Sequence, residues 1–288
     1  MRGLRDSQRG EYPPAWCARA SRRGREPPLR VRPVRPSTPR VLLDLLARPE
    51  RHRYGARRTQ RADLYLPGGP GPHPVAVAIH GGYWRAKYGK RLMKAVCADL
   101  ARRGVAAWNI EYRKMGRGQG GGWPMTFDDV SAAIDHLAAL DDPRLDLTQV
   151  TAVGHSAGGQ LALWSASRRD PRVRVHRVVA QAAVCNLAVA GQPAWDFIGG
   201  SPDQVPERFA EANPMQIVPL GVPTLLVHGA DDETVPVARS RDYVKAAAAA
   251  GDDVRLIEPS PGGHRVHIDP RTDAWQAAAE WIARPATR

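Results

Sequence analysis

The chain has 288 residues, of which 43% are hydrophobic and 25% charged, so it can bury the core of one large globular domain. Its net charge of +13 would suit a nucleic-acid-binding protein, but residues 1–62 carry 17 Arg, no Lys and 5 acidic residues, and the rest is nearly neutral. A neutral body argues against an extended footprint for nucleic acid, and no apolar run approaches the roughly 18 residues that span a membrane, so we expect neither partner.

The three cysteines, Cys17, Cys97 and Cys185, are odd in number and far apart. This spacing predicts neither a disulfide framework nor a zinc site. The first residues include arginines but lack the apolar segment of a secretory signal peptide. We therefore expect a cytoplasmic protein in a reducing compartment.

Residues 1–40 are rich in arginine and proline and show almost no apolar periodicity, which predicts disorder. We interpret them as a solvated tail or an upstream extension of the coding frame. A basic arm that binds RNA or a membrane is the alternative interpretation. Residues 41–47 are compatible with a short helix at the edge of one domain, which we expect to span residues 41–288.

From about residue 54 onward, short apolar runs alternate with amphipathic segments. Runs rich in β-branched and apolar residues predict strands at 61–67, 75–80, 105–112, 149–154, 177–184, 223–229 and 253–258. Apolar residues at helical spacing predict helices at 88–103, 125–140, 157–168, 237–250 and 272–283. This alternation predicts an α/β fold with a doubly wound, mostly parallel sheet. The proline-rich stretch near 186–221 interrupts it and predicts a lid over the carboxyl edge of the sheet, where such sheets place their sites.

Residues 154–158 read Gly-His-Ser-Ala-Gly between an expected strand and an expected helix. In that context the pattern predicts a sharp turn that holds Ser156 above the sheet as a nucleophile. Gly154 and Gly158 are needed because side chains two residues to either side of the serine would collide. The alternative is a glycine-rich turn with an incidental serine. His155 is expected to pack beside Ser156 and not to act as its base, because its side chain points the other way.

A serine hydroxyl needs a histidine base, and the histidine needs an orienting carboxylate. The segment HGADDETVP (228–236) follows an expected strand and offers Asp231 or Asp232 as the acid. The spacing His-Gly-x-x-Asp-x-x-Val-Pro favours Asp232, with Asp231 and Glu233 as solvated neighbours.

The segment PGGHRVHIDP (261–270) follows the last expected strand and offers His264 or His267 as the base. His264 is favoured because the two glycines before it would let the loop approach the serine closely. The order serine, acid, histidine is the one expected when each group follows a strand of such a sheet.

Negative charge that develops on a substrate oxygen requires backbone N–H donors. Ala157 opens the helix after the serine, so its N–H has no partner within that helix. A second donor is expected from Gly81 or Gly82, which follow the strand at 75–80 and expose their N–H groups. The sequence therefore predicts an oxyanion hole formed by Gly81, Gly82 and Ala157.

Four segments, HGGYW (80–84), GHSAGG (154–159), HGADDETVP (228–236) and GGH (262–264), occur in the order typical of a known superfamily. Over roughly residues 54–283 the chain resembles the α/β-hydrolases. HGGYW is similar to the esterase/lipase branch that includes kynurenine formamidases, enzymes that remove an N-formyl group from an aromatic amine.

The resemblance implies Ser156 as nucleophile, Asp232 as acid and His264 as base, with Gly81, Gly82 and Ala157 as the oxyanion hole. Tyr83 stands where many lipase-like relatives carry a third glycine, which favours the formamidase-like branch. Arg265 and His267 stand where aromatic or aliphatic residues are expected. The arginine-rich segment at residues 1–40 also departs from the family pattern.

These residues predict a serine hydrolase that cleaves carboxylic esters or N-formyl and aryl amides through an acyl-serine. A carboxylesterase or an arylformamidase-like enzyme fits best, and no metal or organic cofactor is required. The alternatives are a peptidase for short or blocked peptides and a non-catalytic binding protein with a hydrolase fold.

Tyr83, Trp84, Trp195 and Phe197 are the candidates for a pocket that accepts an aromatic ester or amide, although each could equally pack in the core or the lid. A small acyl group on an aromatic leaving group is the first expectation. The sequence is also compatible with a homodimer.

Overall fold

The computed structural model describes residues 37–39, 48–260 and 262–284, all within the unit Pro33–Arg288. The disorder predicted for residues 1–40 and the helix predicted at 41–47 lie outside the described residues, apart from positions 37–39. Within the described part of the chain, no helix is both long enough and apolar enough to cross a bilayer.

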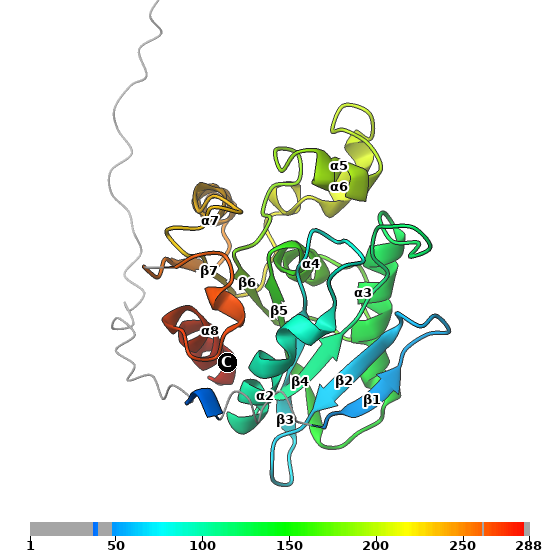
Figure 1. The fold of residues 1–288 in the computed structure, drawn as a ribbon, viewed down its shortest axis with the longest axis vertical. Helices are drawn as coiled ribbons and strands as arrows, with labels where there is room; N and C mark the ends of the chain where they lie inside the picture. Colours follow the sequence, from blue (N-terminus) through cyan, green and yellow to red (C-terminus); the bar gives the residue numbers. More distant parts are fainter. Residues whose placement is uncertain (1–36, 40–47, 261, 285–288) are drawn as a thin grey trace, which may run out of the picture. The chain divides into compact units, whose positions relative to one another are not determined.

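An eight-stranded sheet organises the described residues (Figure 1), in the order β1-β2-β4-β3-β5-β6-β7-β8. The strands are β1 (Glu50–Arg53), β2 (Arg61–Tyr65), β3 (His73–Ile79), β4 (Ala106–Ile110), β5 (Leu145–His155), β6 (Arg177–Gln181), β7 (Thr224–Val227) and β8 (Val254–Ile257). β1 and β2 run antiparallel to their neighbours, and β3 to β8 are parallel. The predicted doubly wound, mostly parallel sheet is therefore confirmed.

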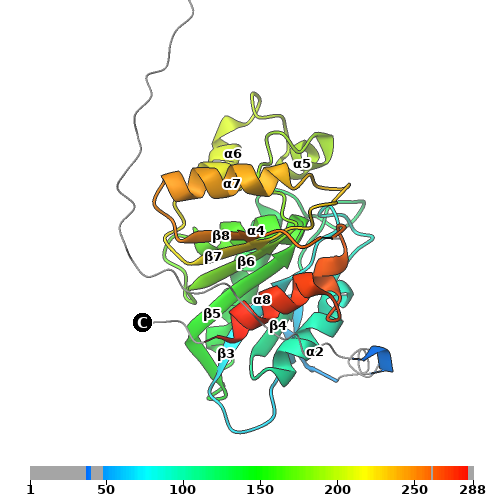
Figure 2. The ribbon, with the colours of Figure 1, turned by 90° about the vertical axis from the view of Figure 1, so that its left-hand side faces the viewer.

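Helices cover both faces of this sheet (Figure 2). α2 and α8 pack on one face, and α3, α4 and α7 pack on the other. The helical elements are η1 (Lys90–Met93), α2 (Lys94–Arg102), α3 (Met125–Asp135), η2 (His136–Ala139), α4 (Ala157–Ala166), α5 (Gln192–Ile198), α6 (Pro206–Ala212), η3 (Pro214–Gln216), α7 (Ala238–Ala249), η4 (Val266–Ile268) and α8 (Asp273–Ala283). Each of the five predicted helices from residue 88 onward is present, with the first two ending or beginning in a 3-10 turn.

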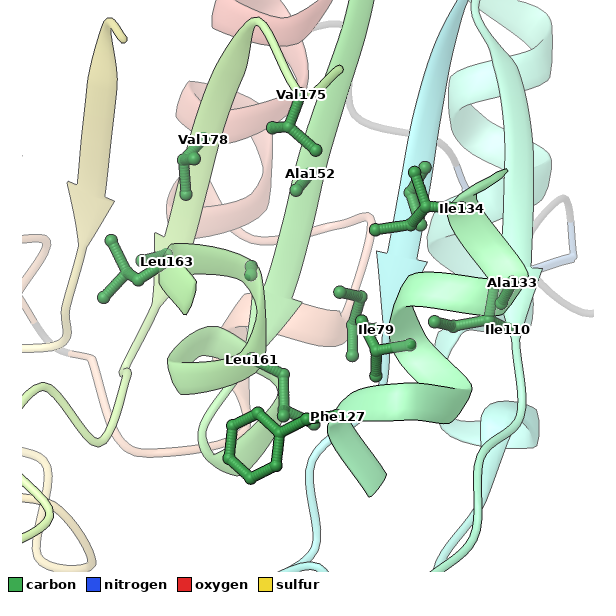
Figure 3. Close-up of a cluster of buried hydrophobic side chains, with 14 of the residues drawn as sticks. Ile79, Ile110, Phe127, Ala133, Ile134, Ala152, Leu161, Leu163, Val175 and Val178 are labelled. Carbon is green, nitrogen blue, oxygen red and sulfur yellow. The ribbon is translucent and has the colours of Figure 1, made fainter. Parts of the chain in front are cut away.

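The core explains why the central strands read as continuous apolar runs. Along β5, Ala152 joins the cluster under α3 and α4, and its neighbour Val153 joins the cluster under α2 and α8. Successive side chains of a strand point to opposite faces, so a strand covered on both sides must be apolar throughout. Figure 3 shows Ile79 and Ala152 of the sheet in the same buried cluster as Phe127 of α3. This packing fixes the ends of β3, β5, β6, β7 and β8, where the candidate site lies.

The insertion between β6 and β7 contains α5, α6 and η3 and lies beyond α4, at the top of Figure 1. It occupies the segment predicted as a lid. Phe197 of α5 and Phe209 of α6 are both buried in the cluster that includes α4. The insertion is therefore anchored to the main domain through aromatic side chains.

Candidate active site

Ser156 occupies the turn between β5 and α4 with φ 56° and ψ −121°, a strained conformation for a residue with a side chain. Its N–H donates to the carbonyl of Gln181 in β6 at 2.8 Å. A Cβ on Gly154 would lie 2.0 Å from the Gly158 carbonyl oxygen, and a Cβ on Gly158 would lie 2.1 Å from that of Ile79. Glycine is therefore required on both sides of Ser156, as the motif predicts.

Asp232 follows β7 in a loop, and its carboxylate is fully buried. Its Oδ2 accepts a hydrogen bond from His264 Nδ1 at 2.7 Å, and its Oδ1 accepts from the N–H groups of Thr234 and Val235 at 2.8 and 2.9 Å. Burial alone would raise the pKa of Asp232, but hydrogen bonds from His228, His264 and Val235 outweigh it and hold the pKa well below its usual value. Asp232 is therefore an ionised group that can orient a histidine.

Asp231 differs from its neighbour. It is exposed, and its Oδ2 accepts only a longer hydrogen bond, 3.3 Å, from the backbone N–H of Gly262. The structure thus brings Asp232, and not Asp231, to the histidine.

His228 is a second histidine on Asp232, and no role was predicted for it from the sequence. Its Nε2 lies 3.2 Å from Asp232 Oδ2 and 2.8 Å from the Val235 carbonyl oxygen. Because both oxygens accept, Nε2 carries the ring proton, and Nδ1 accepts from Ser240 Oγ at 2.7 Å. His228 therefore helps, together with His264, to fix the position of the Asp232 carboxylate.

His264 keeps part of its side chain at the surface, 15% exposed, while its Nδ1 bonds to Asp232. Its backbone carbonyl oxygen accepts from His155 Nε2 at 2.7 Å, and the two rings lie 4.6 Å apart between centroids. His155, which directly precedes Ser156, thus connects the serine turn to the loop that carries His264 (the histidine loop). Across the described ranges, no hydrogen bond joins Ser156 Oγ directly to His264 Nε2.

His267, the alternative base, is fully buried. Its Nε2 accepts from the Gly229 N–H at 3.3 Å. Burial, reinforced by the neighbouring histidines, lowers the pKa of His267 to about 2. A neutral, buried imidazole has no access to substrate, so the geometry favours His264 as the base.

The two glycines before His264 have a different role from the one expected. A Cβ on Gly229 would lie 1.4 Å from the Gly262 carbonyl oxygen, so Gly229 and Gly262 let the acid loop and the histidine loop touch. A Cβ on Gly263 would have no heavy atom within 4 Å. The close approach is therefore to the Asp232 loop and not to Ser156, because the histidine reaches the acid from the neighbouring strand.

The loop after β3 presses against the serine turn. A Cβ on Gly81 would lie 2.5 Å from the His155 carbonyl oxygen and 3.0 Å from Ser156 Cβ. Gly82 has φ 118°, and a side chain there would overlap the ring of Tyr88. Within the described part of the chain, nothing accepts the N–H groups of Gly82 or Ala157. Both donors therefore stay available beside Ser156.

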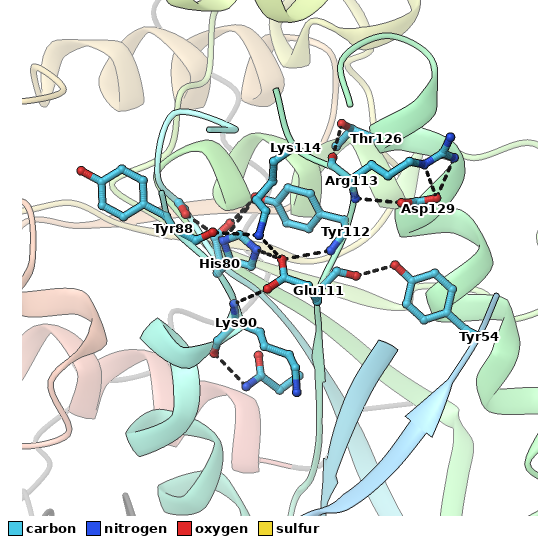
Figure 4. A network of polar contacts seen from close by, with 12 residues as sticks. Tyr54, His80, Tyr88, Lys90, Glu111, Tyr112, Arg113, Lys114, Thr126 and Asp129 are labelled. Atoms are coloured by element: carbon cyan, nitrogen blue, oxygen red, sulfur yellow. Dashed lines mark hydrogen bonds and ion pairs between the residues drawn. The ribbon is translucent and has the colours of Figure 1, made fainter. Parts of the chain in front are cut away.

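A buried polar network lies behind this loop (Figure 4). His80 Nε2 hydrogen-bonds to Glu111 Oε1 at 2.9 Å, and its Nδ1 lies 2.8 Å from the Gly81 carbonyl oxygen. Lys114 Nζ bonds to the same Glu111 oxygen and to the Tyr88 carbonyl oxygen, both at 2.8 Å. Burial would raise the pKa of Glu111, but His80 and Lys114 lower it to about 2. This network, which the sequence did not reveal, ties the loop after β3 to the end of β4.

The four predicted substrate-binding aromatics do not form one pocket. Trp84 and Phe197 are buried in the core, where their rings stack 4.4 Å apart, so they offer no surface to a substrate. Trp195 is half-buried in the insertion and donates to the Ala188 carbonyl oxygen at 3.1 Å. Tyr83, which follows Gly82 in the loop after β3, is 42% exposed. Of the four, Tyr83 alone is exposed and belongs to a loop that lies close to Ser156.

The described residues contain no group of three or more His, Cys, Asp or Glu arranged to hold a metal ion. Cys97 and Cys185 are buried free thiols, and burial raises the pKa of Cys185 to about 12. Neither thiol is therefore prepared for nucleophilic chemistry.

Comparison with known proteins agrees with this architecture. The family model BD-FAE matches residues 62–246, a range that contains Gly81 and Gly82, Ser156 and Asp232. Esterase LipC of Mycobacterium tuberculosis (strain ATCC 25618 / H37Rv) is 29% identical over 218 residues, 67% of this chain and 53% of the relative. A probable isoprenylcysteine alpha-carbonyl methylesterase ICME of Oryza sativa subsp. japonica is 24% identical over 233 residues, 71% and 55% of the two chains. The chain spans about half the length of these curated relatives.

Solved structures share the fold. A truncated carbohydrate esterase from gut microbiota superposes with a TM-score of 0.70 at 21% identity, covering 80% of this chain and 93% of that one. Esterase Est2 from the Planctomycetes species Thermogutta terrifontis superposes with a TM-score of 0.69 at 19% identity, covering 81% and 91%. With the family match over more than half of its length, the chain belongs to the BD-FAE family, within the esterase and lipase branch of the α/β-hydrolases.

Proposed function

We propose that this protein is a serine carboxylesterase with Ser156 as nucleophile, His264 as general base and Asp232 as the acid that orients the histidine. In this reaction Ser156 Oγ attacks the ester carbonyl while His264 Nε2 takes its proton. His264 then gives the proton to the leaving alcohol, and a water molecule, activated by the same histidine, hydrolyses the acyl-serine.

The hydrogen bond of 2.7 Å between His264 Nδ1 and Asp232 Oδ2 is the observation that carries the proposal. It fixes the proton on Nδ1 and leaves Nε2 as the basic nitrogen. Nucleophile–base contacts are often long in the absence of substrate, so Ser156 Oγ and His264 Nε2 are expected to meet in the enzyme–substrate complex.

The unpartnered N–H groups of Gly82 and Ala157 supply the second requirement of acyl transfer. A Cβ on Gly81 would lie only 3.0 Å from Ser156 Cβ, and this closeness of the loop to the serine supports the assignment. Two preorganised donors in a water-poor site stabilise the oxyanion by several kcal/mol, on the order of 3 for one donor.

Short acyl esters are the proposed substrates. The relatives whose names state an activity are esterases, and one structure of Thermogutta terrifontis esterase 2 contains propionate. Cleavage of an N-formyl group from an aromatic amine uses the same chemistry and remains the second candidate, favoured by Tyr83 in place of a third glycine and by its exposure beside the loop.

A two-part experiment tests this function. A fluorophosphonate probe should label the protein, and peptide mass mapping should place the label on Ser156. A turnover panel should then compare p-nitrophenyl acetate, longer p-nitrophenyl esters and N-formylkynurenine, with acetate hydrolysed fastest. Deformylation faster than ester hydrolysis would replace the carboxylesterase with a formamidase, and failure of the probe to label Ser156 would contradict both.

A further inference from the structure

A cavity of about 1250 Å³ lies outside the candidate triad. It lies between the β1–β2 edge of the sheet and η1, and Glu111 forms part of its wall (Lys90 and Glu111 are seen in Figure 4). Eight cationic residues and two acidic ones line it. The cationic ones are Arg48, Arg51, Arg53, Arg61, Lys87, Lys90, Arg91 and Lys94.

The sheet register places several of these charges on one face. Arg53 of β1 lies directly opposite Arg61 of β2, and Arg51 lies opposite Asp63. Residues two apart in a strand, and residues directly opposite across a pair, share a face. Two like charges facing each other destabilise an antiparallel pair, so the Arg53–Arg61 pair has a cost that a bound anion would remove.

The two carboxylates of the cavity are already engaged elsewhere. Asp63 forms an ion pair with Lys90, and Glu111 is held by His80 and Lys114. In the described ranges no carboxylate lies within ion-pair distance of Arg51, Arg53, Arg61 or Arg91, and all four residues are exposed. Among the described residues, therefore, no carboxylate compensates their positive charge.

The charge is also localised. Residues 48–288 contain 31 Lys and Arg against 25 Asp and Glu, a net of +6, which equals the net charge of the cavity lining. The remainder of the body is thus balanced. Charged residues on β1 would be enough to protect an edge strand from pairing with another chain. That role does not account for Lys87 and Arg91, which reach the same cavity from the segment after β3.

A second cavity of about 650 Å³ extends the basic surface. It shares Arg61 and Glu111 with the first and adds Arg57, Arg58 and Lys114. The positive surface therefore continues from the β1–β2 edge into the β1–β2 turn, a span that suits an elongated anion with several charges.

We propose that this cavity binds a polyphosphate-type anion, one that carries at least two phosphoryl groups. The planar guanidinium presents paired N–H donors that match phosphate oxygens, and arginines predominate among the uncompensated cations. The site lies outside the proposed triad, so it goes beyond the proposed function, and its binding is measured without turnover.

Titration calorimetry of the full chain with inorganic triphosphate tests the proposal. The variant Arg51→Gln/Arg53→Gln/Arg91→Gln removes three cavity charges. The matched control, Arg169→Gln/Arg172→Gln/Arg174→Gln, removes three charges from the exposed loop after α4. The wild type and the control should bind triphosphate, and the cavity variant should bind at least about tenfold more weakly than the control because three charge-assisted contacts are lost.

All three cavity arginines are exposed, so the variant is expected to keep the wild-type melting temperature, and Arg91→Gln alone gives a second test with a loss of at least about threefold. Triphosphate that does not bind the wild type overturns the proposal. A difference in triphosphate affinity of less than about tenfold between the cavity variant and the control also overturns the proposal. It would show that the ion binds other cations, such as the arginines of residues 1–47. Vesicles of cardiolipin, a lipid whose headgroup carries two phosphoryl groups, identify the source of the phosphate in a sedimentation assay: cavity-dependent binding of vesicles assigns a lipid headgroup, and binding of triphosphate alone assigns a soluble ligand.

Discussion

Asp232 is the residue on which the candidate site converges. His264 and His228 both contact its Oδ2, and two backbone N–H groups donate to Oδ1. A carboxylate with this many donors stays ionised far below neutral pH, which its depressed pKa reflects. The neighbouring Asp231, one position earlier, has none of these constraints.

The first prediction follows from that contrast. Asp232→Asn should lower kcat for a short ester by about 10³-fold to 10⁴-fold, because an amide that donates to Nδ1 favours the wrong histidine tautomer. Asp231→Asn should retain turnover within about twofold of the wild type, since Asp231 is exposed and an asparagine oxygen can still accept from the Gly262 N–H. Equal losses in the two variants, measured with p-nitrophenyl acetate, would remove Asp232 from the site.

At the scale of elements, the acid loop and the histidine loop meet at two glycines. Gly229→Ala places a methyl group against the Gly262 carbonyl oxygen, with 1.4 Å between them, so the loops must separate. We expect kcat/KM to fall by about 10²-fold, the usual effect of a displacement of about 1 Å between reacting groups.

Gly263→Ala is the matched control in the same loop. A methyl group there meets no heavy atom within 4 Å, so activity and the free energy of unfolding should stay near the wild-type values, within about 0.5 kcal/mol. If Gly229→Ala behaves like Gly263→Ala in the ester assay, the contact between these loops does not position the site.

The third prediction concerns the loop after β3, which contains Gly81 and Gly82 and is the proposed oxyanion loop. Glu111→Gln should weaken the buried bonds to His80 and Lys114, which lie beneath Gly81 and Tyr88. The free energy of unfolding should fall by about 3 kcal/mol, because Lys114 loses its charged partner in the interior. Because the proposed oxyanion donor Gly82 lies in this loop, kcat should fall by about tenfold or more while KM changes little.

Glu258→Gln serves as the control for Glu111→Gln. Glu258 also forms an ion pair, with Arg241, but at the surface, so its loss should cost less than about 1 kcal/mol and leave kcat unchanged. Unfolding in urea and steady-state kinetics measure both variants. A drop in stability with unchanged kcat would give the network a purely structural role.

The central parallel strands, such as β3, β4, β6 and β7, were predictable because they are buried on both faces and therefore read as short apolar runs. β1 was missed because Glu-Arg-His-Arg has no apolar alternation, as expected for an edge strand that meets solvent. The spacing around the acid selected Asp232, because motif spacing reflects local backbone geometry. The roles of His228, Glu111 and Gly229 could not be inferred, since each depends on a contact between segments distant in the sequence.

At the scale of the whole molecule, two histidines are buried without charge. Burial lowers the pKa of His155 to about 3 and that of His267 to about 2, against about 6.5 in the unfolded chain. Below pH 6.5 the unfolded chain binds protons that the native state does not, so the free energy of unfolding falls as pH falls.

The fourth prediction is the slope of that loss. Between about pH 6 and pH 4 the free energy of unfolding should decrease by about 1.4 kcal/mol per pH unit for each of the two histidines. Below about pH 4.5, Glu111 adds to the loss, because its native pKa of about 2 lies below its ordinary value. Urea unfolding at a series of pH values measures the slope, and His267→Gln should reduce it by about half. A slope unchanged by His267→Gln would show that this histidine is not held neutral.

Turnover of p-nitrophenyl acetate by Ser156→Ala is the most direct measurement of the proposed acyl-serine mechanism. Loss of the nucleophile should lower kcat by about 10⁵-fold or more, with the circular dichroism spectrum and melting temperature close to those of the wild type, because an alanine fits the space of the serine side chain. Wild-type turnover in a folded Ser156→Ala protein would contradict the account.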